Sequence, residues 1–367
     1  MFVMWKLAIL GLSLIAPLIL PLKGESLGRV FGIGLPYLTW IWANFDGVHY
    51  AYIAQNGYQY PNFAFFPLLP LLIHLVKQIL SVHAVEAGLL VVHVSLLLSA
   101  IALYKIVTLD HSKAVAFGSV AMLFLFPLSF FYGAVYTESL FLLTSLLSFY
   151  FARKGEWLKA GIIGYFASAT RLVGIALLPA LLAEWFIMQK GEKSPKLLVK
   201  KFFREKAFLI LLIPLGLTSY MVYLQIFYGD FLLLQKSMAD WGQAQIVLPA
   251  QVLFRYYRIL LTVPWNIAYF IAAVELIATI LYFLLSVFVL RRVRLSYGVF
   301  MLVLLTIPTF TGTLQSMPRY ILQLFPAFIG LSVLLLRSRM LFAAVSILAL
   351  VLQFLFVSMF TRGWFVA

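Results

Sequence analysis

The chain has 367 residues, of which 64% are hydrophobic and 11% charged, and its net charge is +15. Repeated apolar runs of about 20 residues, each able to cross a hydrocarbon core, exclude a soluble globular protein. They predict an all-α polytopic membrane protein, with the excess lysine and arginine retained in cytoplasmic loops rather than on a nucleic-acid surface. The sequence contains no cysteine, which excludes disulfides and thiolate metal sites.

The first predicted element is an apolar segment over residues 4–22. It carries a single lysine, Lys6, and lacks a small-x-small cleavage pattern, so we expect a retained span rather than a signal peptide. Ten further spans follow along the chain, which gives eleven in all. Their expected ranges are 84–107, 114–133, 138–152, 158–170, 172–188, 207–228, 264–290, 296–314, 319–336 and 340–360.

The apolar stretch 63–80 is not counted as a span. Pro67 and Pro70 interrupt it, and His74 and Lys77 lie within it. If it crossed the membrane, all the later basic clusters would lie outside, against the positive-inside rule. We therefore expect an amphipathic helix in the outer interface. The N-terminus is then cytoplasmic in the cell membrane, and the basic clusters share the cytoplasmic side, at 105–113, 153–159, 190–206, 291–294 and 337–339.

This orientation places four charged residues at the outer ends of spans. Asp46 lies in the first outer loop, 23–83, within "WANFDGVHYAYIAQNGY". Glu138 follows "FYGAVYT", Arg171 lies in "SATRLVG", and Arg319 lies in "QSMPRYIL". Ionisable groups at membrane depth are costly and usually face a partner or a pathway. The set has the chemistry of a base, a helper and two anion-binding groups.

Each of these residues also has a purely structural interpretation. Asp46 could cap a helix that begins there, and Glu138 could interact with the dipole of the next helix. Arg171 and Arg319 could extend to the lipid headgroups. The histidines lack a metal-ligand spacing, so no cofactor is predicted, although a divalent metal stays open.

Several motifs resemble those of the GPI mannosyltransferase 2 (PIG-V-type) family. They keep their order along the chain and begin in the first outer loop. The segments that carry the resemblance are "WANFDGVHYAYIAQNGYQYPNFAFFPLLPLL", "FPLSFFYGAVYTESLFLL", "ATRLVGIALLPALL", "SMPRYILQLFPAFIGL" and the terminal "RGWFVA". The family belongs to the GT-C superfamily of integral membrane glycosyltransferases. The resemblance therefore implies one GT-C-type transmembrane domain over residues 1–367, with amphipathic juxtamembrane helices in the first outer loop.

The resemblance also implies an inverting transfer of a sugar, mannose first, from a polyprenyl-phosphate donor at the extracytoplasmic face. In that superfamily the acid of the first outer loop is the proposed base, which is Asp46 here. The tryptophan that usually precedes this acid is replaced by Phe45, and Trp42 lies three residues earlier. With the short chain, this departure suggests a prokaryotic relative. Its acceptor would be a lipid-linked glycan, glycolipid or glycoprotein rather than a GPI precursor.

The expected site then has three parts. Asp46 removes the acceptor proton, and Arg319 and Arg171 hold the donor phosphate. Tyr320 and His49 are further expected hydrogen-bond donors to this phosphate. The predicted supporting residues are Glu138, Tyr136, Trp42, Tyr50 and Trp241, the last in an outer loop over 229–262 that could cover the acceptor.

Two rival functions stay open. A lipid or sugar transporter would also place charges in a helical bundle, although we see neither inverted repeats nor acids at mid-membrane. The second rival is a GT-C enzyme that uses another lipid-phosphate sugar, such as arabinose, glucose or an aminosugar.

Overall fold

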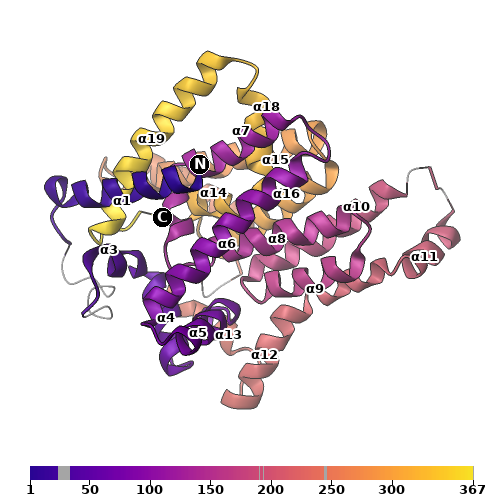
Figure 1. The fold of residues 1–367 in the computed structure, drawn as a ribbon, viewed down its shortest axis with the longest axis horizontal. Coiled ribbons are helices and arrows are strands. Elements are labelled where there is room, and N and C mark those ends of the chain that lie inside the picture. The colour runs from indigo at the N-terminus through magenta and orange to yellow at the C-terminus, as the bar shows by residue number, and fades with distance from the viewer. Residues whose placement is uncertain (24–33, 190, 193, 244–245, 367) are drawn as a thin grey trace. The chain divides into compact units, whose positions relative to one another are not determined.

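The structure is a computed structural model that describes residues 1–23, 34–189, 191–192, 194–243 and 246–366 (Figure 1). Within these ranges the chain forms α-helices and short 3-10 turns and no β-strand. The predicted all-α fold is confirmed. Residues 24–33 and 244–245, which belong to two of the predicted outer loops, lie outside the described residues, as do positions 190 and 193 of the basic cluster.

The chain forms two compact units. One comprises Met1–Leu143 and Leu331–Val366, and the other comprises Thr144–Gly330. We call them the terminal unit and the central unit. Two helices, α8 (Glu138–Arg153) and α18 (Phe325–Leu335), each run from one unit into the other.

The terminal unit is built around the long helix α6. This helix begins at Ala84 because His83 and Glu86 form a reciprocal cap: the His83 ring accepts from the Val85 N–H, and the Glu86 carboxylate accepts from the His83 N–H. Helix α6 ends at Val107. The other elements of the unit are α1 (Phe2–Ile19), α3 (Tyr37–Trp40), η1 (Ile41–Ala43), α4 (Asp46–Asn56), η2 (Asn62–Ala64), α5 (Leu68–Leu80), α7 (Lys113–Leu125), η3 (Ser129–Gly133) and α19 (Arg339–Thr361).

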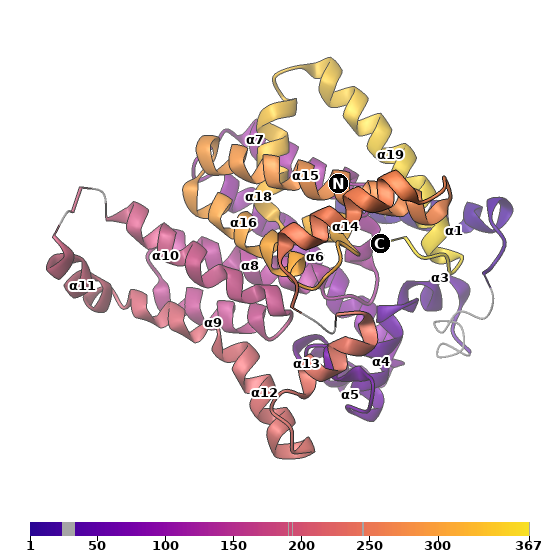
Figure 2. The same ribbon diagram turned by 180° about the vertical axis from the view of Figure 1, so that it is seen from behind.

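Helix α5 is the element predicted to lie in the outer interface. It packs against α4 and α6, as both views show (Figures 1 and 2). Leu69 and Ile73 are fully buried there, whereas Leu75 and Ile79 on other faces are 54% and 77% exposed. The predicted helix is confirmed, and its uncovered apolar surface suits an interfacial position. Its place relative to a membrane stays a prediction.

The first and last long helices, α1 and α19, pack side by side (Figure 1). Ser129 joins them, because its hydroxyl accepts from Trp5 Nε1 at 2.9 Å and from Gln353 Nε2 at 2.6 Å. The segment after α1 is held by the end of the chain, where Arg362 Nε donates to the Leu20 carbonyl at 2.8 Å.

The central unit contains the remaining elements. They are α9 (Trp157–Ser168), η4 (Leu172–Ala176), α10 (Leu177–Met188), α11 (Pro195–Arg204), η5 (Ala207–Leu212), α12 (Leu215–Tyr228), α13 (Leu233–Met238), η6 (Ala239–Trp241), α14 (Pro249–Thr262), α15 (Ile267–Arg292), α16 (Leu295–Thr309), α17 (Met317–Tyr320) and η7 (Ile321–Gln323). Helices α15 and α16 form a hairpin, and α16 also packs against α10.

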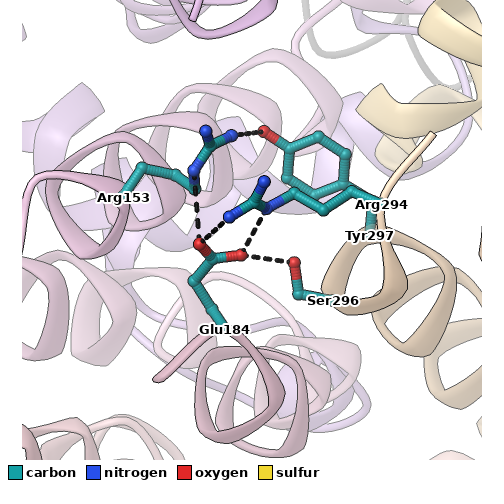
Figure 3. A network of polar contacts seen from close by, with 5 residues as sticks. All are labelled: Arg153, Glu184, Arg294, Ser296 and Tyr297. Atoms are coloured by element: carbon teal, nitrogen blue, oxygen red, sulfur yellow. Dashed lines mark hydrogen bonds and ion pairs between the residues drawn. The ribbon is translucent and has the colours of Figure 1, made fainter. Parts of the chain in front are cut away.

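A buried ion network joins α8, α10 and α16 in this unit (Figure 3). Glu184 on α10 accepts two hydrogen bonds from Arg294, at 2.7 and 2.6 Å, and one from the Ser296 hydroxyl at 2.6 Å. Arg153, at the end of α8, lies 3.2 Å from the same carboxylate and donates to the Tyr297 hydroxyl. The two arginines were expected only as loop charges, so their burial around one acid is a feature that the sequence reasoning missed.

Five helical segments of the described chain are long and apolar enough to cross a membrane, or six if one bent pair counts as a span. The five are Phe2–Ile19, Ala84–Val107, Ala207–Tyr228, Tyr269–Arg292 and Arg339–Thr361. The bent pair, Met317–Gln323 with Phe325–Leu335, turns by 89°, so the predicted span 319–336 is not one straight helix. The count of eleven spans stays a prediction.

Candidate active site

The predicted base, Asp46, is the first residue of α4 and is partly buried. The residue before it, Phe45, has φ 57° and ψ −120°, a backbone conformation that residues other than glycine rarely adopt. The Phe45 ring packs on Phe360 and Phe365, with centroids 5.8 and 6.0 Å away. Such strain persists where surrounding contacts hold it, and it clusters at functional sites. The turn therefore fixes the backbone conformation at the start of α4, where Asp46 lies.

Three hydrogen bonds hold the backbone just before Asp46. The Val135 N–H donates to the Trp42 carbonyl at 2.9 Å, and the Tyr136 hydroxyl donates to the Asn44 carbonyl at 2.9 Å. Asn44 Nδ2 in turn donates to the Phe360 carbonyl at 3.1 Å. Tyr136, predicted as a supporting residue, thus donates its hydroxyl hydrogen to the loop backbone. The structure gives it a positioning role for the Asp46 turn.

His49 lies three residues after Asp46, so the two side chains share one face of α4. Its Nδ1 is 2.7 Å from Asn62 Oδ1, and its ring stacks on Phe65 with a centroid distance of 4.8 Å. An amide oxygen only accepts, so Nδ1 carries the proton in this contact, and Nε2 is the acceptor of the neutral ring. Asn62 was missed in the sequence, where it lies inside "YPNFAFF" without any motif of its own.

The other predicted supporting residues of the terminal unit are buried. Glu138 is fully buried in the first turn of α8, where a carboxylate is stabilised by the helix dipole. Trp42 is 1% exposed and stacks on Phe360, and Tyr50 meets Phe65 edge-on at 5.1 Å. These side chains shape the interior around the Asp46 turn.

In the central unit, Arg171 occupies the break between α9 and η4. The break is tight: a Cβ on Gly174 would come within 2.6 Å of the Ser168 backbone, so only glycine fits there. The Arg171 guanidinium lies over the Tyr320 ring, 5.8 Å from its centroid, within cation–π range. The structure thus brings Arg171 to the same short helix that carries Arg319.

Tyr256 and Glu275 support the segment that leads into this short helix, α17. The Tyr256 hydroxyl donates to Glu275 at 2.6 Å and accepts from the Leu314 N–H at 3.0 Å. Burial, with a smaller effect of the Glu275 contact, raises the pKa of the Tyr256 phenol to about 12, so it stays a donor. Ser316 then adopts φ 64° immediately before α17. The sequence reasoning missed both residues, since nothing in their local sequence marks them.

The predicted site residues fall into two groups. The terminal unit carries Asp46, His49, Tyr136, Glu138, Trp42 and Tyr50, and the central unit carries Arg171, Arg319, Tyr320 and Trp241. Trp241 ends the 3-10 turn η6, within the predicted outer loop 229–262, and is 36% exposed. Among the described residues, no three His, Asp or Glu side chains are grouped so that they could hold a metal ion.

A family model described as mannosyltransferase (PIG-V) matches residues 37–357. This match spans most of the chain and includes both groups of site residues. The chain belongs to the mannosyltransferase (PIG-V) family. The predicted family is thereby confirmed. A search of curated proteins found no match.

Among solved structures, this PIG-V family chain is similar to ArnT from Cupriavidus metallidurans bound to undecaprenyl phosphate. The TM-score is 0.54 at 15% sequence identity, with 94% of this chain and 62% of ArnT covered. The chain thus spans less than two thirds of the length of ArnT. At this identity the likeness concerns the fold alone, and it agrees with the predicted all-helical fold.

Proposed function

We propose that the chain is an inverting glycosyltransferase that moves mannose from a polyprenyl-phosphate donor to an acceptor at the extracytoplasmic face of the cell membrane. The observation that carries the proposal is the strained Phe45–Asp46 turn, held by Tyr136 and Asn44 inside the region that the family model matches. The undecaprenyl phosphate in the ArnT structure supports a lipid-phosphate donor. The acceptor would be a lipid-linked glycan, a glycolipid or a glycoprotein.

The reaction needs one base and one leaving group. The acceptor oxygen forms a bond to C1 of the sugar while the bond from C1 to the phosphate oxygen breaks. The acceptor proton goes to the Asp46 carboxylate, and polyprenyl phosphate leaves with the electron pair. One displacement inverts C1 and needs no second carboxylate, which fits the single acid, Asp46, in the first turn of α4.

The departing phosphate gains negative charge as the bond breaks. Arg319 and Arg171 are proposed to stabilise it, because a guanidinium can donate two hydrogen bonds to a phosphate. The Tyr320 hydroxyl and the His49 ring are further proposed hydrogen-bonding partners of the phosphate. The contact of Arg171 with the Tyr320 ring supports this assignment, since it gathers the three central-unit residues around α17.

The test is transfer of labelled sugar in membranes that contain only the purified chain and defined lipids. Mannose and, separately, other sugars would be supplied on polyprenyl phosphate, together with a membrane acceptor fraction. We expect product with mannose and loss of about 10²–10⁴-fold in turnover for Asp46→Asn, which keeps the shape and removes the base. Near-normal transfer by Asp46→Asn would remove Asp46 from the mechanism. Movement of the lipid across the bilayer without transfer would favour the transporter alternative.

A further inference from the structure

Helix α11 (Pro195–Arg204) is strongly amphipathic and basic. With 3.6 residues per turn, Leu198, Val199, Phe202 and Phe203 share one face of this helix. The opposite face carries the basic residues Lys196, Lys200, Lys201 and Arg204. The pattern of aromatic and aliphatic residues opposite a cationic face is typical of helices that lie in the plane of a membrane surface.

Much of the apolar face has no cover in the structure. Val199 is 59% and Phe203 is 60% exposed. One edge is packed, where the Phe202 ring meets Trp185 of α10 edge-on at 5.0 Å, and the Phe203 ring also lies 5.6 Å from Phe208 of η5. The helix is therefore attached to the central unit along one side and presents its remaining apolar surface outward.

Short connections hold α11 at the end of an apolar segment. Only Glu205 and Lys206 separate it from Ala207, the first residue of a segment long and apolar enough to span a membrane. Glu205 also accepts hydrogen bonds at 2.9 Å from Trp185 Nε1 and Gln189 Nε2, which ties this turn to α10. Figures 1 and 2 both show α11 beyond the end of α10, next to the connection into η5. Such a tether keeps the helix within reach of the bilayer surface.

We propose that α11 lies in the headgroup layer of an anionic lipid leaflet. Its apolar face would enter the boundary of the acyl chains, and its lysines and arginine would contact the lipid phosphates. Lys201 is also 3.4 Å from Glu192, but residues 195–206 carry five basic side chains and one acidic one, so the surface stays cationic. Each basic residue at an anionic surface is worth about a fivefold preference in binding.

The tether and the charge together favour lipid over a protein partner. A helix that ends two residues before a candidate membrane span brings its apolar face to the bilayer surface without any further assembly. The proposal is independent of the proposed glycosyl transfer, because no residue of α11 belongs to either group of site residues.

The absence of cysteine from the sequence gives a direct test. The full chain would carry a single environment-sensitive fluorophore at Val199→Cys or Phe203→Cys, with Lys200→Cys as the control on the basic face. Each would be reconstituted in nanodiscs of phosphatidylcholine, with or without phosphatidylglycerol. We expect labels at 199 and 203 to be quenched by nitroxide-labelled acyl chains and shielded several-fold from aqueous iodide, and the label at 200 to stay open to iodide.

A second comparison isolates the role of charge. Replacing Lys196, Lys200, Lys201 and Arg204 together by glutamine should restore iodide quenching at position 203 several-fold in anionic nanodiscs. Removing phosphatidylglycerol should have the same effect on the unsubstituted helix. Equal iodide access at 199, 200 and 203 in anionic nanodiscs would overturn the proposal. If the label at position 203 is shielded from iodide to the same extent with or without phosphatidylglycerol and with or without the glutamine substitutions, the proposal is also overturned, and a protein contact is indicated. Unchanged thermal unfolding of the glutamine variant shows that the fold is intact.

Discussion

Single residues around Asp46 and Arg319 owe their geometry to contacts that are distant in the sequence. The hydrogen bond from Tyr136 to the Asn44 carbonyl joins positions 92 residues apart, and Leu314 meets Tyr256 across 58 residues. A motif can identify Asp46 and the helix that starts there, because both signals are local. The same motif contains no information about which distant hydroxyl holds the turn, so the hydrogen bond from Tyr136 to the Asn44 carbonyl could not be predicted from it.

The positioning role of Tyr136 is testable with Tyr136→Phe. The variant removes the hydrogen bond to Asn44 and should cost about 1 kcal/mol of stability. Because the Asp46 turn loses a constraint, we expect kcat to fall several-fold while the donor KM stays close to the original value. Tyr165→Phe is a matched control, since it removes an exposed hydroxyl contact with Ser219 and should leave kcat unchanged. An equal loss of kcat in both variants would contradict the specific role.

The two candidate phosphate-binding arginines can be separated from surface arginines by comparing lysine with alanine. Arg319→Ala and Arg171→Ala should raise the donor KM and lower kcat. Lysine should rescue only in part, because it keeps the charge and loses the bidentate fork. Arg258, which is exposed on α14, is the control. If the lysine and alanine variants at 319 and 171 both behave like Arg258 variants, these arginines are headgroup anchors.

At the scale of elements, long apolar helices were predictable and their interruptions were not. The ranges expected for the helices α6, α15 and α19 match closely, because an unbroken apolar run of this length has one stable conformation in lipid. Helix α18 starts at Phe325 because Pro326 lacks an N–H and cannot continue the preceding turn. The proline was visible in "LQLFPAF", but the hydropathy of the surrounding residues masked its effect.

The network around Glu184 is expected to hold α8, α10 and α16 together, and loss of its central charge should destabilise the fold. Glu184→Gln leaves Arg153 and Arg294 without their buried counter-charge, and breaking such a pair typically costs about 3–5 kcal/mol. Thermal unfolding in detergent should show a large loss of stability. Glu156→Gln is the control, because the Glu156–Lys159 pair is exposed and worth about 1 kcal/mol or less. Comparable losses in the two variants would show that the network is not a clamp.

At the scale of the whole molecule, the sequence predicted fold class and family because both depend on properties spread over the chain. Hydropathy marks the helices, and motifs in a fixed order extend from residue 42 to the end of the chain. The number of crossings is harder to predict, because short apolar helices such as α7 and α16 fall below the length of a full span. Their ends require cover from neighbouring protein, which is a tertiary property.

The orientation of the chain gives the last prediction. The positive-inside rule places the basic cluster at 190–206 in the cytoplasm and the Asp46 and Arg319 segments outside. Since the chain has no cysteine, single replacements report cleanly. Gln55→Cys, at the exposed end of α4, and Gln315→Cys, exposed just before α17, should react with an impermeant maleimide in sealed cells. Ser194→Cys, immediately before α11, should react only after permeabilisation. Labelling of Ser194→Cys in sealed cells, with protection of the other two, would invert the orientation and would place the Asp46 turn on the cytoplasmic side.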